Sequence, residues 1–127
     1  MSTLGATLDQ LSPGAVEISL RPQPSISQQH GFVHAGAVSA IADTAAGYAA
    51  LSLIGAGRGV LTTEFKINFV APATGDRIVA RAKVVKSGRM LTVAQTEVFA
   101  ERAEQEKLVA LLTATLIAVE GRDGVSD

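Results

Sequence analysis

Apolar and polar residues alternate over most of this chain, and the alternation predicts a strand-rich domain. Val16, Ile18 and Leu20 share one face of a predicted strand, and the other face is polar. Four further segments alternate in the same way, at residues 61–70, 77–86, 90–100 and 107–119. In the last of these, the even-numbered positions from Leu108 to Ala118 form one apolar face. Because the connections between these four segments are short, neighbouring strands should be antiparallel.

Residues 35–54 follow a different pattern, which predicts a central buried helix. The segment is rich in alanine, free of proline and apolar nearly all round. The glycines of residues 55–59 would end it. Residues 35–57 have nearly the length of a membrane span. Alanine and glycine dominate them, however, and Asp43 lies near their centre, which favours a buried helix in a soluble fold.

The order of these elements is strand, long helix and four strands. The apolar face of the sheet needs a cover, and only one helix is available. We therefore expect an α+β fold in which an antiparallel sheet wraps around one long central helix. The sequence contains no internal repeat and no linker, so residues 1–127 should form a single domain with a frayed tail from about residue 120.

The composition excludes several classes of function. The 127 residues include 11 Lys and Arg and 12 Asp and Glu, so the net charge is −1 and no basic field exists for nucleic acid or an anionic membrane. Cysteine is absent, which excludes disulfides, thiolate metal sites and a cysteine nucleophile. The two His show no ligand spacing, so no metal is expected. No targeting segment is visible, and we expect a cytoplasmic protein without a cofactor.

Asp43 is a lone carboxylate in the run that looks most buried. Burial of an unpaired carboxylate costs several kcal/mol unless partners compensate. From the sequence, a catalytic role and a structural salt bridge are both open for Asp43. Just upstream, "HGFVHAG" leads into the helix, where the free amide groups of Ala35 and Gly36 could bind an oxyanion. A histidine just before a helix is more often a structural hydrogen-bonding residue than a catalyst, and this applies to His30 and His34.

The spacing of these groups predicts a dimer. Asp43 lies eight residues after Ala35, or about 12 Å along a helix axis. A general base and an oxyanion donor should both lie about 3 Å from the reacting centre. One chain cannot easily supply both groups, whereas two chains related by a two-fold axis can. An enzyme with this sequence should therefore be a homodimer with two shared sites.

Two motifs point to a known family. His34 begins "HAG", Asp43 lies nine residues after it, and Gln28 or Gln29 precedes it; a six-residue offset from the His favours Gln28. The second motif is "NFVAPATGD", followed later by "SGR". In this order and spacing the motifs resemble the PaaI-like acyl-CoA thioesterases, which have the hotdog fold. The resemblance covers most of the chain.

The resemblance implies a role for each matched position. Asp43 would activate water or attack the thioester directly, and both routes are open. The amide of Ala35, alone or with that of Gly36, would hold the oxyanion. Gln28 would orient the carbonyl group or the water. Ala35 stands where the family has the first motif glycine, so it keeps the amide donor and adds a methyl group.

Further positions match less specific parts of the family pattern. Either Thr62 or Thr63 would help to place the water, although both are also ordinary strand residues. The residues Ser87, Gly88 and Arg89 would contact the phosphate end of coenzyme A, although an arginine in a turn is commonly just solvated. Tyr48 lies off the helix face of Asp43 and is expected to serve in core or dimer packing.

The resemblance implies hydrolysis of an acyl-CoA thioester, with coenzyme A as part of the substrate. Two alternatives remain open. The first is a hotdog hydratase or dehydratase, in which His34 would act together with the acid. The second is a non-catalytic acyl-CoA-binding protein. The family usually forms homotetramers, by pairing sheets or helix sides. The acyl group is open too, since the pocket positions suit aromatic and medium aliphatic chains.

Overall fold

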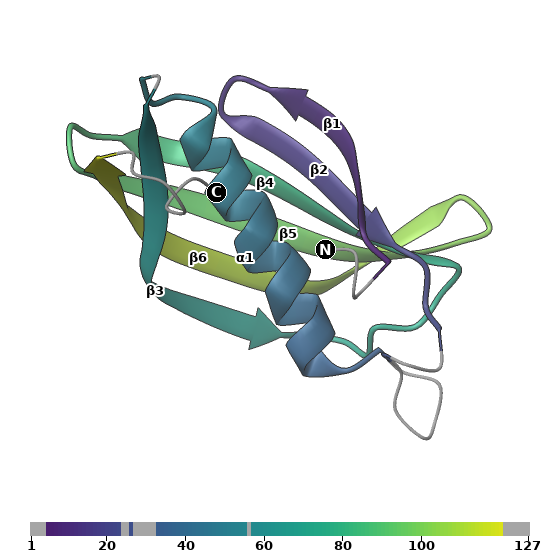
Figure 1. Cartoon of the computed structure of the whole chain (residues 1–127). Coiled ribbons are helices and arrows are strands. Elements are labelled where there is room, and N and C mark those ends of the chain that lie inside the picture. Colours follow the sequence, from purple (N-terminus) through teal and green to yellow (C-terminus); the bar gives the residue numbers. More distant parts are fainter. Residues whose placement is uncertain (1–4, 24–25, 27–32, 56, 121–127) are drawn as a thin grey trace.

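A six-stranded antiparallel sheet curls around one helix in the computed structural model of this chain, which describes residues 5–23, 26, 33–55 and 57–120 (Figure 1). The strands are β1 (Thr7–Ser12), β2 (Ala15–Leu20), β3 (Arg58–Phe69), β4 (Arg77–Ser87), β5 (Leu91–Arg102) and β6 (Gln105–Glu120). Helix α1 (Ala35–Leu51) lies across one face of the sheet. The strand order is β1-β2-β4-β5-β6-β3, so β1 and β3 are the edges. The predicted α+β architecture is confirmed.

Strand β1 was missed by the sequence pattern. It pairs with β2 in a hairpin, and all six of its residues are exposed. Leu8 and Leu11 are three residues apart, which breaks the period of two. A register shift between Leu8 and Gln10 accommodates this spacing. An exposed edge strand with an irregular register has no alternating buried positions from which it could be predicted.

Helix α1 buries one face against the sheet. Its buried residues are Ala37, Val38, Ile41, Ala42, Ala45, Ala46, Ala49 and Ala50. Because these side chains are small, the sheet approaches closely, and the Thr96 hydroxyl donates a hydrogen bond of 2.9 Å to the carbonyl oxygen of Ala42. The opposite face is not buried as predicted, since Asp43 and Thr44 are only half-buried. The helix ends at Leu51, three residues earlier than expected.

A β-bulge corrects the predicted face of β6. The register with β5 shifts at Val98, which leaves Val109 as an extra residue between the paired positions. Val109 is 1% exposed and Leu108 is 37% exposed. Val109 therefore takes the place that simple alternation assigned to Leu108.

Within the described residues, no helix has the length and apolar character needed to span a membrane. Strand β6 continues to Glu120. The tail that was expected to fray from about there, residues 121–127, lies outside the described residues.

Candidate active site

Asp43 on α1 and Thr62 on β3 form the polar pair at the centre of the candidate site. The Thr62 hydroxyl donates a hydrogen bond of 2.9 Å to Oδ1 of Asp43. The β3–β6 register shifts between Thr62 and Glu64, so Thr63 is the extra residue of a bulge. The Thr63 hydroxyl donates to the backbone carbonyl oxygen of Thr115, at 3.0 Å. Of the two predicted threonines, the structure brings Thr62 to the aspartate.

The Asp43 carboxylate has no cation beside it in the part of the chain that the structure describes. The ion pairs found there all involve Arg77 or Arg81, and none includes Asp43. A structural salt bridge therefore has no support among the described residues. Within one chain Asp43 is half-buried rather than deeply buried, which corrects the sequence-based expectation.

A hollow of about 190 Å³ opens beside this carboxylate, between α1 and the start of β3. Its lining residues are Asp43, Thr44, Gly47, Tyr48, Leu51, Val60 and Thr62. Tyr48 packs against the core and also lines the hollow. The sequence pattern predicts a packing role alone for Tyr48, so its place in the lining of the candidate site is a finding of the structure. Tyr48 lies off the helix face of Asp43, but it still reaches the hollow because β3 as well as α1 forms the walls.

The N-terminus of α1 presents two open amide groups. His34 is the N-cap residue, and its side chain makes no capping hydrogen bond. Ala35 and Gly36 are exposed. Their N–H groups are the first two of the helix and have no acceptor among the described residues. They lie at the positive end of the helix dipole, where a developing negative charge is stabilised.

The motif "NFVAPATGD" fixes the start of this helix. The Val33 amide donates a hydrogen bond of 2.8 Å to the carbonyl oxygen of Ala73, which lies in the motif. A Cβ atom added to Gly75 would lie 2.7 Å from the carbonyl oxygen of Glu101, so the motif glycine is required by close backbone approach. The hydrogen bond between Ala73 and Val33 gives this motif a structural role, which is to position the start of α1.

A second hollow, of about 210 Å³, lies at this end of α1. Its lining is apolar and consists of Val33, Ala35, Val38, Phe69, Ala71, Pro72, Ala73 and Val109. It shares no residue with the hollow at Asp43. Ala35 and Asp43 are eight residues apart in one continuous helix, or about 12 Å along its axis. The hollow at the start of α1 contains Phe69, the last residue of β3, and the hollow further along α1 contains Val60, near the start of β3. Helix α1 and strand β3 therefore run in opposite directions, with one hollow towards each end.

The amide expected upstream of the helix cannot be located in the structure. Gln28, its alternative Gln29, and His30 lie outside the described residues. Their placement stays a prediction.

The turn between β4 and β5 contains the "SGR" motif. The Gly88 amide donates a hydrogen bond of 2.7 Å to the carbonyl oxygen of Leu91. A Cβ atom at Gly88 would lie 2.8 Å from the same oxygen, so the turn itself requires glycine. Ser87 and Arg89 are exposed on either side of it.

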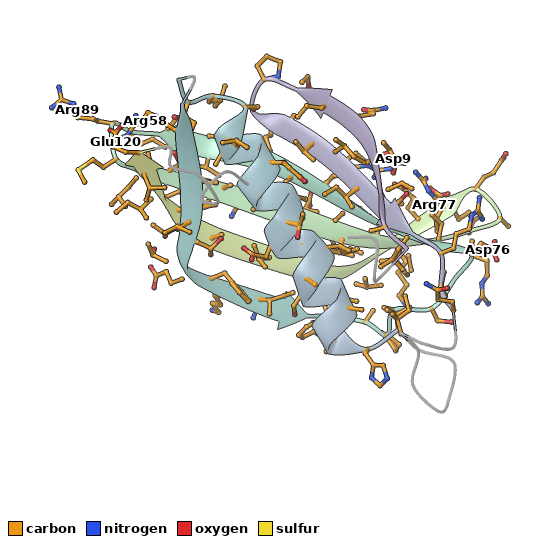
Figure 2. The ribbon with its side chains drawn as sticks, viewed as in Figure 1. Asp9, Arg58, Asp76, Arg77, Arg89 and Glu120 are labelled. Atoms are coloured by element: carbon orange, nitrogen blue, oxygen red, sulfur yellow. The ribbon has the colours of Figure 1, made fainter. Side chains whose placement is uncertain are left out.

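Arg89 is available for an anionic ligand. Figure 2 shows it at the same end of the molecule as Arg58 and Glu120, with its side chain extending away from the sheet. It forms no ion pair with any described residue. Side chains that could hold a metal ion do not cluster, as no three His, Asp or Glu gather among the described residues.

The architecture and the site together define the class of protein. An antiparallel sheet wrapped around one helix, with a helical carboxylate beside an edge strand, is the hotdog fold of thioesterases. The chain belongs to the Thioesterase superfamily, whose family model matches residues 30–107, more than half of its length.

Solved structures support this assignment. A thioesterase family protein from Silicibacter pomeroyi is 51% identical, with a TM-score of 0.92, over 95% of this chain and 89% of that one. A mutant of the phenylacetic acid degradation protein PaaI from Thermus thermophilus is 26% identical, with a TM-score of 0.80, over 92% of this chain and 96% of that one. A thioesterase from Haemophilus influenzae, 24% identical over 94% of this chain and 81% of that one, has the same fold, with a TM-score of 0.85. The expected resemblance to PaaI-like hotdog thioesterases is confirmed, and the family supports thioester hydrolysis as the general activity.

Proposed function

We propose that this protein hydrolyses an acyl-CoA thioester to a free carboxylic acid and coenzyme A. The observation that carries the proposal is the pair of Asp43 and Thr62. The carboxylate has a hydroxyl partner at one oxygen and no neighbouring cation among the described residues. It therefore keeps lone pairs available for a proton or for a carbonyl carbon.

In the general-base route, Asp43 takes a proton from water while the water oxygen bonds to the thioester carbonyl carbon. The negative charge that develops on the carbonyl oxygen is stabilised by the amide of Ala35, alone or with that of Gly36. The C–S bond then breaks, and the proton held by Asp43 passes to the sulfur of the departing coenzyme A. Gln28 would orient the carbonyl group or the water.

In the nucleophilic route, Asp43 attacks the carbonyl carbon itself and the thiolate leaves. Water then hydrolyses the mixed anhydride and restores the carboxylate. Thr62 supports either route in the same way, because its hydrogen bond orients the carboxylate and stabilises its charge.

The two halves of the site come from two chains in this proposal. Ala35 and Asp43 are about 12 Å apart along one helix, which is too far for both to reach one carbonyl group. Asp43 lies beside Thr62 in the first half of β3, and Ala35 lies with Phe69 at the end of the strand. A two-fold axis near the middle of β3 and perpendicular to it turns a second copy end for end. That rotation brings Asp43 of one chain towards Ala35 of the other.

Strand β3 offers the surface for such a dimer. It is an edge strand of 12 residues, so one row of its backbone groups has no strand partner among the described residues. Leu61, Phe65 and Phe69 on this strand are 53%, 45% and 48% exposed. Pairing of two β3 strands would continue the sheet across the dimer, bury these side chains and enclose Asp43. Association of two dimers into a tetramer is the further expectation.

The coenzyme A end of the substrate would lie against the turn between β4 and β5. The Ser87 hydroxyl and the exposed Arg89 side chain offer a hydrogen-bond donor and a positive charge for a phosphate group. The turn is held in shape by Gly88, so these side chains stand on a defined backbone.

The proposal is tested by thiol release from a panel of aromatic and aliphatic acyl-CoAs, with the wild type and Asp43→Asn side by side. Turnover that is lost in the variant while the dimer persists supports it. Coenzyme A binding without any turnover would favour a non-catalytic acyl-CoA-binding protein. Formation of a hydrated or dehydrated acyl-CoA would favour the hydratase alternative.

A further inference from the structure

A glycine in the middle of α1 is unexplained by the fold. Gly47 lies one helical turn after Asp43, where glycine destabilises a helix relative to alanine. Its φ is not in the left-handed region, and a Cβ atom added there meets nothing within 4 Å. Gly75 and Gly88, by contrast, are required by close backbone contacts. Neither strain nor crowding accounts for Gly47.

The open space at Gly47 belongs to the hollow at Asp43. One end of this hollow is polar, since Asp43 and Thr62 meet there. The other end is formed by Tyr48, Leu51 and Val60, and these present mainly apolar atoms.

The hollow follows the helix away from the carboxylate. Leu51 lies eight residues after Asp43, or about 12 Å along the helix axis. Val60 lies two residues before Thr62 on β3 and packs against the core. Gly47 is the residue between the polar and the apolar ends that adds no side chain to the space.

We infer that this hollow holds the apolar body of the acyl group and that Gly47 sets the largest size it accepts. This inference rests on the proposed function for the identity of the bond that is cleaved. The substrate class is thioesters of compact apolar acids, with a ring or a medium aliphatic chain. The hollow of about 190 Å³ is larger than the cavity of about 150 Å³ that suffices for benzene.

The second hollow, at Ala35, is the other apolar space at the site. None of its lining residues is glycine. Of these two hollows, the one at Asp43 alone is lined by a helix-interior glycine, Gly47, which leaves space at a cost in helix stability.

The test measures binding of S-propyl-, S-hexyl- and S-decyl-coenzyme A by calorimetry. These thioethers cannot be hydrolysed, so the result does not depend on turnover. The variants are Gly47→Ala and Gly47→Leu. Gly55→Leu is the matched control, because Gly55 also has no neighbour within 4 Å of an added Cβ atom and lines neither hollow.

We expect Gly47→Leu to weaken binding of the hexyl and decyl compounds about tenfold or more, because a leucine side chain excludes several methylene groups from the hollow. Binding of the propyl compound should change little, and Gly55→Leu should behave as the wild type. An equal response to all three lengths would overturn the inference. Sedimentation shows whether each variant is still a dimer. If Gly47→Leu is monomeric, the test rests on Gly47→Ala. Binding by dimeric Gly47→Ala that depends on alkyl length as in the wild type would reject the inference.

The same variants separate the two proposals. If acyl-CoAs are not hydrolysed but the length profile shifts as expected, the proposed hydrolysis fails and the assignment of Gly47 stands. If the wild type hydrolyses acyl-CoAs and the Gly47 variants keep the wild-type length profile, hydrolysis stands and the acyl group lies elsewhere.

Discussion

The hydroxyl of Thr62 lies 2.9 Å from the carboxylate of Asp43, although one residue belongs to an edge strand and the other to the helix. The bulge at Thr63 separates two adjacent threonines that are chemically identical. Thr62 meets the acid, and Thr63 meets the backbone of β6. This difference allows a matched pair of substitutions.

Thr62→Val should lower kcat about tenfold or more, because a hydrogen bond to a charged group contributes about 1.5–3 kcal/mol. Thr63→Val should leave kcat near that of the wild type and lower the free energy of unfolding by about 1 kcal/mol. Steady-state thiol release and urea unfolding of both variants give these values. Equal losses of kcat in the two variants would contradict the assigned role of Thr62.

Two inactive variants should restore activity when they are mixed. Asp43→Asn removes the acid, and Ala35→Pro removes the amide donor. Proline is favoured at the first position of a helix, and the extended ψ of 141° at His34 suits a following proline. In a mixed dimer, intact Asp43 of one chain faces intact Ala35 of the other.

The measurement is thiol release after the two variants are co-expressed and purified as a heterodimer. Each homodimer should lose at least about a hundredfold in kcat, and the heterodimer should recover roughly half of the wild-type activity. A site built within one chain predicts no recovery. Circular dichroism of each variant checks that α1 is retained.

Two substitutions in the "SGR" turn should have different effects, one on substrate binding and the other on stability. Arg89→Ala should raise KM for an acyl-CoA about tenfold through loss of a charge-assisted hydrogen bond, and leave KM unchanged for an N-acetylcysteamine thioester without phosphates. Gly88→Ala should instead lower the free energy of unfolding by about 1–3 kcal/mol, since its methyl group would meet the Leu91 carbonyl oxygen at 2.8 Å. A KM effect of Arg89→Ala on both substrates would exclude phosphate contact.

An ion pair on the outer face of the sheet predicts a pH dependence of stability. The hydrogen bonds that Arg81 donates lower the pKa of Glu106. A lowered pKa in the folded state stabilises the fold above the unfolded value of about 4.3, and this contribution is lost as the pH falls through the folded value.

Glu106→Gln should therefore be less stable than the wild type at pH 7, and the difference should shrink as the pH falls below about 4. Urea unfolding at a series of pH values measures it. The control is Glu104→Gln, because Glu104 forms no ion pair with any described residue. A difference that grows towards low pH would reverse the assigned sign.

Much of the fold follows from local pattern. Period-two alternation predicts β2 to β6 because each of these strands packs one face on the helix, and alanine content predicts α1. The pattern fails at β1, which is exposed on all six residues, and at Leu108, where a bulge reverses the face. A bulge depends on pairing with another strand, so it leaves no periodic signal of its own.

The sequence by itself determined that Asp43 lies on a helix whose first amides are open, and that eight residues separate it from Ala35. These facts depend only on helix geometry. The tertiary structure alone decided that Thr62 rather than Thr63 meets the acid, and that Tyr48 and Gly47 share its hollow. Those relationships arise where β3 packs along α1, and contacts between segments far apart in the chain depend on register and bulges that no local pattern encodes.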